Sequence, residues 1–109
     1  MRGAEYAVPT DSLEGVALAI ASLGLSFTPH DSSYWGPYLL HQGPGKEEVK
    51  LYLNSDPMFD PQSDPPEERF FKVMHKQHGV LIDATLGHVK HASLLDSLQR
   101  AFPGSVRIG

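Results

Sequence analysis

Four of the six histidines form two pairs whose residue types could bind a metal ion. His75 and His78 are three residues apart, as are His88 and His91, and Asp83 lies between the two pairs. Imidazole and carboxylate groups bind zinc, and a catalytic zinc site needs only three protein ligands and a water. However, the spacing of four residues that places two histidines on one face of a helix is absent. We therefore expect no metal and no other cofactor, with a small metal-dependent enzyme as an alternative.

Asp83 is a second candidate for chemistry, because it lies inside the apolar segment Val80–Leu86. A carboxyl group that points into a core has a raised pKa and can act as an acid or a base. Strand alternation, however, places the even-numbered apolar residues of this segment on one face and Asp83 on the other, beside Leu81 and Thr85. We therefore expect Asp83 to lie on a solvated face of a sheet.

The segment 55–68 has an unusual composition, with five carboxylates, no lysine or arginine, and four of the nine prolines. Its aspartates recur every four residues, whereas a calcium-binding EF-hand loop needs ligands at alternate positions, a central glycine and a closing glutamate. Prolines restrict the unbound segment, so less entropy is lost when it binds. We expect a stiff acidic loop that binds a basic partner. The alternative is a solvated connection. The candidate binding residues are Asp56, Phe59, Asp60, Asp64, Glu67 and Glu68.

Three aromatic residues cluster in the segment Ser33–His41, which Pro37 interrupts. Proline cannot donate to a strand ladder, so this segment is expected to be an edge or bulged strand. Tyrosine and tryptophan are enriched among the residues that dominate protein–protein binding energy. The alternative, that the rings only cover the open face of a small sheet, stays open here. The candidate partner-binding residues of this segment are Tyr34, Trp35 and Tyr38.

The elements that position these residues can be predicted from apolar periodicity. Asp11 is expected to cap a helix whose apolar residues run from Leu13 to Leu23, and Gly24 is expected to end it. A second helix is expected to begin near Ser93. The expected strands are residues 25–29, 33–41, 48–54, 69–75, 80–86 and 105–108, and residues 1–9 are expected to form a disordered tail. The predicted fold is a single α+β domain of residues 1–109, in the order α-β-β-β-β-β-α-β, with two helices packed on an antiparallel sheet of about four to six strands.

Composition excludes several classes of protein. A chain of 109 residues has the size of one domain. The chain has no cysteine, which excludes a disulfide framework and a thiolate metal site. Its net charge of −4 argues against nucleic-acid binding, which depends on lysine and arginine. The longest uncharged run, Gly15–His30, is interrupted by polar residues and proline, so no membrane span is expected. We expect a cytoplasmic protein.

Several short motifs resemble those of small bacterial immunity-type proteins, which accompany polymorphic toxins of contact-dependent or secreted systems. The resemblance covers about residues 25–108. Its motifs are Leu25-Ser26-Phe27, Asp31–Gly36, Glu48–Asn54, Asp83-Ala84-Thr85, Leu94–Leu98 and Phe102-Pro103-Gly104. The proline-rich segment 55–68 is longer than the segment expected at this place in such proteins. The resemblance implies that the protein acts by binding a cognate toxin domain and has no catalytic residue.

The function expected from the sequence is therefore that of a non-enzymatic immunity or inhibitor protein. It would neutralise a basic, nuclease-like toxin by occluding the toxin's active surface, with loop carboxylates paired to basic side chains of the partner. The main alternative is a secretion chaperone that binds an extended client. A homodimer would favour the chaperone, and a monomer that forms a tight one-to-one complex would favour the inhibitor.

Overall fold

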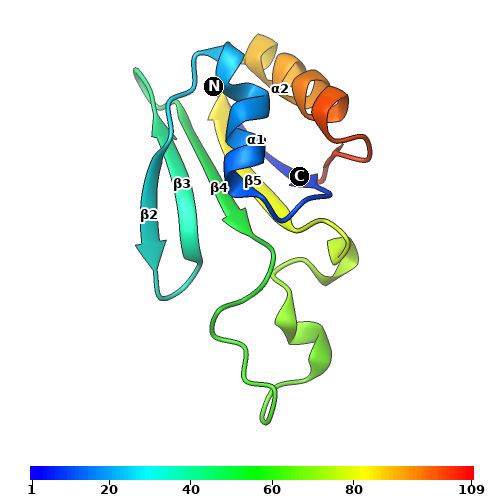
Figure 1. The fold of residues 1–109 in the computed structure, drawn as a ribbon. Coiled ribbons are helices and arrows are strands. Elements are labelled where there is room, and N and C mark those ends of the chain that lie inside the picture. The colour runs from blue at the N-terminus through cyan, green and yellow to red at the C-terminus, as the bar shows by residue number, and fades with distance from the viewer.

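A six-stranded antiparallel sheet is the largest element of the protein, which the computed structural model describes over all of residues 1–109. The strands are β1 (Arg2–Val8), β2 (Thr28–Ser32), β3 (Gly36–Gln42), β4 (Glu48–Leu53), β5 (Val80–Leu86) and β6 (Val106–Arg107). They lie side by side in the order β2-β3-β4-β5-β1-β6, and every neighbouring pair is antiparallel. The helices α1 (Leu13–Ile20) and α2 (His88–Ala101) pack on this sheet (Figure 1). The predicted α+β fold is thereby confirmed.

The main hydrophobic core lies between the two helices and one face of the sheet. Alternation along β4 and β5 directs Val49, Leu51 and the even-numbered apolar residues of β5 toward the helices, as predicted. The helices contribute apolar stripes at helical spacing. The fully buried members of these stripes are Val16, Ile20, Leu94 and Leu98. Neither helix is long and apolar enough to cross a membrane.

The expected disordered tail at residues 1–9 is wrong, because Arg2–Val8 forms β1, which lies in the sheet between β5 and the short edge strand β6. The strand pairs along its whole length with β5, from Arg2↔Leu86 to Val8↔Val80. It buries side chains on both faces, with Tyr6 toward the helices and Ala7 on the opposite side. The strand is stabilised by β5, which lies more than seventy residues away along the chain, so local periodicity gives little sign of it.

The ends of both helices differ from the prediction. Ser12, and not Asp11, is the N-cap of α1, and its Oγ accepts the Gly15 N–H at 2.9 Å. After α1 a short 3₁₀ helix, Ala21–Leu23, leads to Gly24, whose left-handed backbone (φ 78°) ends the helical segment as predicted. Helix α2 begins at His88, five residues before the expected start at Ser93.

The strands of the β2–β3 hairpin also differ from the prediction. The edge strand is β2, and β3 lies between β2 and β4. The segment that contains Pro37 is therefore not an edge strand. Pro37 is tolerated because the β3–β4 ladder begins only at the pair Tyr38↔Tyr52, one residue further on. The missing N–H of Pro37 therefore breaks no hydrogen bond with β4.

The segment 54–79 leaves the sheet as a long excursion between β4 and β5, here called the β4–β5 loop (Figure 1). The strand predicted for residues 69–75 is absent. In its place are two 3₁₀ helices, Pro66–Arg69 and Val73–His75, and one isolated bridge, Ser55↔Phe70. The physical reason is that β4 and β5 pair directly with each other, which leaves no free sheet edge beside this segment.

Asn54 fastens the two arms of the β4–β5 loop. It is 1% exposed, its backbone N–H donates to the Gly79 carbonyl, and its own carbonyl accepts the Phe71 N–H. Its side-chain Oδ1 accepts the Lys72 N–H at 2.8 Å. The two N–H groups of its amide reach three carbonyls, those of Lys72, His75 and His78. One side chain thus holds both ends of the loop together.

Candidate functional site

The sheet face opposite the helices carries the aromatic residues that the sequence singled out. Both helices lie on one side of the sheet, so this second face has no helix over it (Figure 1). Ala7, Tyr52 and Leu81 form a small buried cluster here. Partly buried side chains surround that cluster, among them Trp35, Tyr38, Phe71, Val106 and Ile108. We call this side the helix-free face.

Five rings on this face contact one another and form what we call the aromatic cluster: Tyr34, Trp35, Tyr38, Tyr52 and Phe71. Trp35 lies at its centre, with ring centroids 5.6 Å from Tyr34, 5.6 Å from Tyr38 and 6.4 Å from Tyr52. Phe71 closes the circle at 5.8 Å from Tyr52 and 6.1 Å from Tyr34. Most of these pairs have the edge-to-face geometry that aromatic rings prefer. Tyr34 is 60% exposed, so the cluster reaches the solvent.

Charged groups on the helix-free face are largely paired. The Nζ of Lys50 lies 3.4 Å from the centre of the Trp35 ring, a cation–π contact. Lys72 forms an ion pair with Glu5 at 3.2 Å. Both lysines of this face are thereby engaged, and each holds an element in place beside the aromatic cluster.

Asp83 lies on this face, as alternation predicted, with its side chain half-buried. Burial raises the pKa of the Asp83 carboxyl, and the neighbouring Glu5 raises it further, whereas Lys50 acts against this rise. The Tyr52 hydroxyl donates to Asp83 Oδ1 at 3.4 Å. Burial also raises the pKa of Tyr52, with Asp83 as the next cause, which keeps its hydroxyl a donor. No histidine contacts Asp83, and its position suits it to accept a hydrogen bond.

Three of the acidic loop residues shape the loop itself. Asp60 accepts the Gln62 N–H at 2.9 Å and the Ser63 hydroxyl at 2.7 Å, and these contacts lower the pKa of its carboxyl, that from Ser63 most. Asp64 Oδ2 accepts the Asp60 N–H, and Asp56 Oδ1 accepts the Met58 N–H. Such contacts define Asx turns. The four-residue period of the aspartates therefore corresponds to successive turns.

Glu67 and Glu68 differ from these aspartates. Both are exposed at the 3₁₀ helix Pro66–Arg69, and neither forms an ion pair or a side-chain hydrogen bond. Phe59 is half-buried and lines a hollow of about 550 Å³, together with Asp64, Glu67 and Arg69. The loop thus presents two free carboxylates next to a hollow with an aromatic wall.

Both arms of the β4–β5 loop contact the turn that carries the aromatic residues. On the outgoing arm, Pro57 packs against Gly36, where an added Cβ would lie 3.7 Å from the proline ring. On the returning arm, Phe71 contacts Tyr34 and Tyr52. The aromatic cluster and the acidic loop are therefore neighbours in space. In the sequence, more than fifteen residues separate Tyr38 from Asp56.

The histidine pairs do not converge with Asp83. The rings of His75 and His78 lie 5.6 Å apart on the β4–β5 loop, and His78 Nε2 donates to the Gly104 carbonyl. His88 and His91 belong to α2, on the other side of the sheet from Asp83. No three histidine, aspartate or glutamate side chains lie close enough together to bind one metal ion.

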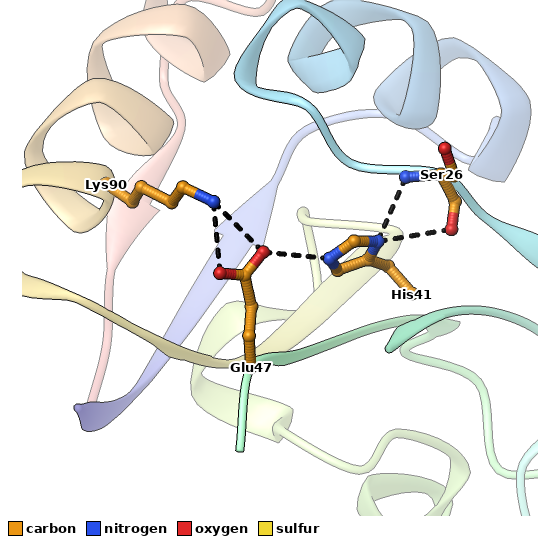
Figure 2. A network of polar contacts seen from close by, with 4 residues as sticks. All are labelled: Ser26, His41, Glu47 and Lys90. Carbon is orange, nitrogen blue, oxygen red and sulfur yellow. Dashed lines mark hydrogen bonds and ion pairs between the residues drawn. The ribbon is translucent and has the colours of Figure 1, made fainter. Parts of the chain in front are cut away.

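A buried polar network that the sequence did not indicate joins the β3–β4 hairpin to α2 (Figure 2). The Ser26 N–H donates to His41 Nδ1 at 3.0 Å, and His41 Nε2 donates to Glu47 Oε1 at 2.9 Å. Lys90 from α2 donates to both carboxylate oxygens of Glu47 at 3.0 Å. His41 and Glu47 are 5% and 7% exposed. These contacts occupy both nitrogens of the His41 ring, and its partner Ser26 contributes backbone atoms, so the network fastens elements together.

Sequence signals for the missed residues differ. The alternation of β4 already placed Lys50 and Tyr52 on the face opposite the core residues. Tyr52 could therefore have been predicted on the helix-free face. Phe71 lies on the loop, where no periodicity applies. His41 and Glu47 are close because a hairpin turn joins them, but their other contacts come from distant segments, Ser26 and Phe27 for His41 and Lys90 of α2 for Glu47.

Comparison with protein-family models finds no match for this chain, and comparison with curated proteins finds no similar protein.

Proposed function

We propose that this chain is a non-enzymatic binding protein that neutralises a basic protein partner, in the manner of an immunity protein. The observation that carries the proposal is the contact between the aromatic cluster and the acidic loop. Pro57 and Phe71, one from each arm of the loop, pack against the residues around Tyr34. Aromatic anchors and unpaired carboxylates thereby lie on neighbouring parts of one surface.

The aromatic cluster and the acidic loop contribute to binding in different ways. Tyr34 is exposed and Trp35 is partly buried. Tyrosine and tryptophan side chains bury a large area at low entropic cost, and such residues dominate binding energy when they lie at the centre of an interface. Free carboxylates at the rim mainly accelerate encounter with a basic partner. Glu67 and Glu68 suit this second role because both are exposed and neither forms an ion pair, although Arg69 and Lys76 line the same hollow as Glu67.

The class of partner follows from this charge. A nuclease keeps arginine and lysine side chains at its active surface in order to bind phosphate. Carboxylates that pair with those side chains compete directly with the nucleic acid, and aromatic contacts slow dissociation of the complex. A nuclease-like toxin domain is therefore the partner that we propose. The immunity-type motifs noted in the sequence agree with this choice.

A secretion chaperone remains the second candidate, because one apolar groove favours it. A groove of about 520 Å³ lies between α1 and the β2–β3 hairpin, and apolar side chains line most of it, among them Leu18, Phe27 and Leu39. Leu18 is 78% exposed. A homodimer, or binding of an extended apolar peptide in this groove, would support the chaperone.

The proposal is tested by co-expression with the product of the adjacent gene, with cell growth and complex stoichiometry as the two measurements. We expect protection from toxicity and a one-to-one complex. Protection should be lost when Trp35→Ala is combined with Glu67→Gln and Glu68→Gln. A matched control, Leu18→Ala with Glu14→Gln and Asp96→Asn, changes the helical side and should protect like the unmodified protein. Protection that survives the first triple variant and fails with the control would contradict the proposed surface.

A further inference from the structure

A pocket with positive charge lies at the opposite side of the sheet from the proposed binding surface. Alternation along β1 directs Arg2 and Tyr6 toward the helices, on the side of the core residues Ala4 and Val8. In β6, Arg107 pairs directly with Tyr6, so its side chain lies on the same side. Helix α2 closes the space above them with His88, His91 and Leu95.

The pocket has a volume of about 170 Å³, and no carboxylate lines it. Neither Arg2 nor Arg107 forms an ion pair. Two of the four arginines therefore line one small cavity, and neither pairs with a carboxylate side chain.

The wall of the pocket is fixed by buried hydrogen bonds. His91 Nε2 donates to the Arg2 carbonyl at 2.7 Å, and His91 Nδ1 accepts from the Tyr6 hydroxyl at 2.7 Å. Burial raises the pKa of Tyr6, and the charge of Arg107 acts in the opposite direction, which indicates that this guanidinium lies near the phenol. Arg107 Nε donates to the backbone oxygen of Gly109 at 3.0 Å, and the two terminal nitrogens of its guanidinium form no hydrogen bond within the protein.

We propose that this pocket binds an oxyanion of phosphate size, held by the guanidinium groups of Arg2 and Arg107 with the His88 imidazole as a further donor. A guanidinium presents N–H donors in a planar fork that matches phosphate oxygens in pairs. The volume accommodates one phosphate group with the first atoms attached to it. The rigid wall of Tyr6 and His91 keeps the site open before the anion arrives, so little reorganisation opposes binding.

This inference is independent of the proposed function, because it concerns the helix-covered side of the sheet. The anion could be free phosphate or the phosphate group of a small ester. The recognition chemistry is the same in both cases. A flat carboxylate such as acetate offers two oxygens and a single charge, so it should bind more weakly than phosphate at two guanidinium groups.

The test is titration of the full chain with inorganic phosphate in chloride buffer, followed by calorimetry and by NMR of the backbone amides. We expect saturable one-to-one binding, with the largest shifts at residues 2, 88 and 107–109. Arg107→Gln and Arg2→Gln should each weaken binding about tenfold or more, as loss of a charge-assisted hydrogen bond does. Arg107→Lys should weaken it less than Arg107→Gln.

Arg100→Gln is the matched control, because it removes the same charge from an exposed position on α2. It should bind phosphate like the unmodified protein. Parallel titrations with glycerol phosphate and acetate separate a phosphate ester site from a site for the free ion, and tighter binding of acetate than of phosphate would overturn the proposal. Shifts that do not saturate, or equal affinities in all four variants, would overturn it as well.

Discussion

The buried carboxylate of Glu47 stabilises the fold, because it accepts hydrogen bonds from His41 and Lys90. The hydrogen bond from His41, followed by that from Lys90, lowers the pKa of Glu47 below its usual value. A lowered pKa in the folded state means that the ionised group stabilises the fold at pH values above the unfolded pKa. This stability is lost as the pH falls through the folded pKa.

The free energy of unfolding should therefore depend on pH through Glu47. Between pH 6 and pH 3, the unmodified protein should lose more stability than Glu47→Gln, whose amide cannot be protonated in this range. Urea melts at several pH values measure the difference. Glu14→Gln is the control, because Glu14 is exposed and forms no ion pair. Parallel pH profiles for Glu47→Gln and the unmodified protein would contradict the role of this network.

At the residue scale, the sequence was informative wherever alternation applied. It placed Asp83 on the face opposite the core and identified Val49, Leu51 and Leu53 as one side of β4. It did not identify the partners of His41 or His91, because polar residues on a buried face look like loop residues until their hydrogen-bond partners are known. The predicted second helix began too late because Ser93, with Asp96 three residues on, is typical of a helix start, whereas α2 begins at His88.

At the scale of elements, the β4–β5 loop depends on Asn54 for its shape. Asn54→Ala removes the side-chain contacts from the start of the loop to its returning arm and leaves backbone groups of Lys72, His75 and His78 without these partners. Three donor groups take part, the two N–H groups of the amide and the Lys72 N–H, so at about 1 kcal/mol for each we expect a loss of about 3 kcal/mol in stability. Denaturant melts give this value, and limited proteolysis should show faster cleavage within residues 55–78. Unchanged stability together with unchanged cleavage would contradict the fastening role.

The charges of the loop divide into two groups, and their substitution should give different results. Glu67→Gln with Glu68→Gln should leave stability unchanged, slow association with a basic partner at low salt and flatten the salt dependence, as expected for steering charges. Asp60→Asn should instead disturb the loop, because Asp60 holds two turns. Stopped-flow or surface-based kinetics at several salt concentrations measure the association rate. Association at the unmodified rate in low salt would show that these two carboxylates are not part of the site.

Elements that depend on distant pairing were the least predictable from sequence. Residues 2–8 form a strand because β5 lies beside them, and residues 69–75 do not form one because β4 and β5 leave no edge for them. The helical stripes and the alternation of β4 and β5 are local, and they were predicted correctly. The acidic loop was predicted from composition alone. The contacts that Pro57 and Phe71 make with the residues around Tyr34 were not predicted.

At the scale of the whole molecule, the two sides of the sheet have different chemistry. The helix-free face carries the aromatic cluster, and the acidic β4–β5 loop extends beyond the sheet (Figure 1). This extension contributes to an elongated shape, with principal extents of 44 × 26 × 23 Å. The helix-covered side carries the apolar groove beside α1 and, at its β6 end, the arginine pocket.

Hydrogen exchange of the protein alone and in complex with the toxin domain that we propose as its partner locates the covered surface without any substitution. If the aromatic cluster and the acidic loop form the binding surface, protection on binding should concentrate in residues 33–38 and 55–72. The groove side of α1 and the segment 25–29 should exchange at the rate of the free protein. Protection concentrated on α1 and residues 25–29, with none at 33–38 or 55–72, would contradict the account and favour the chaperone.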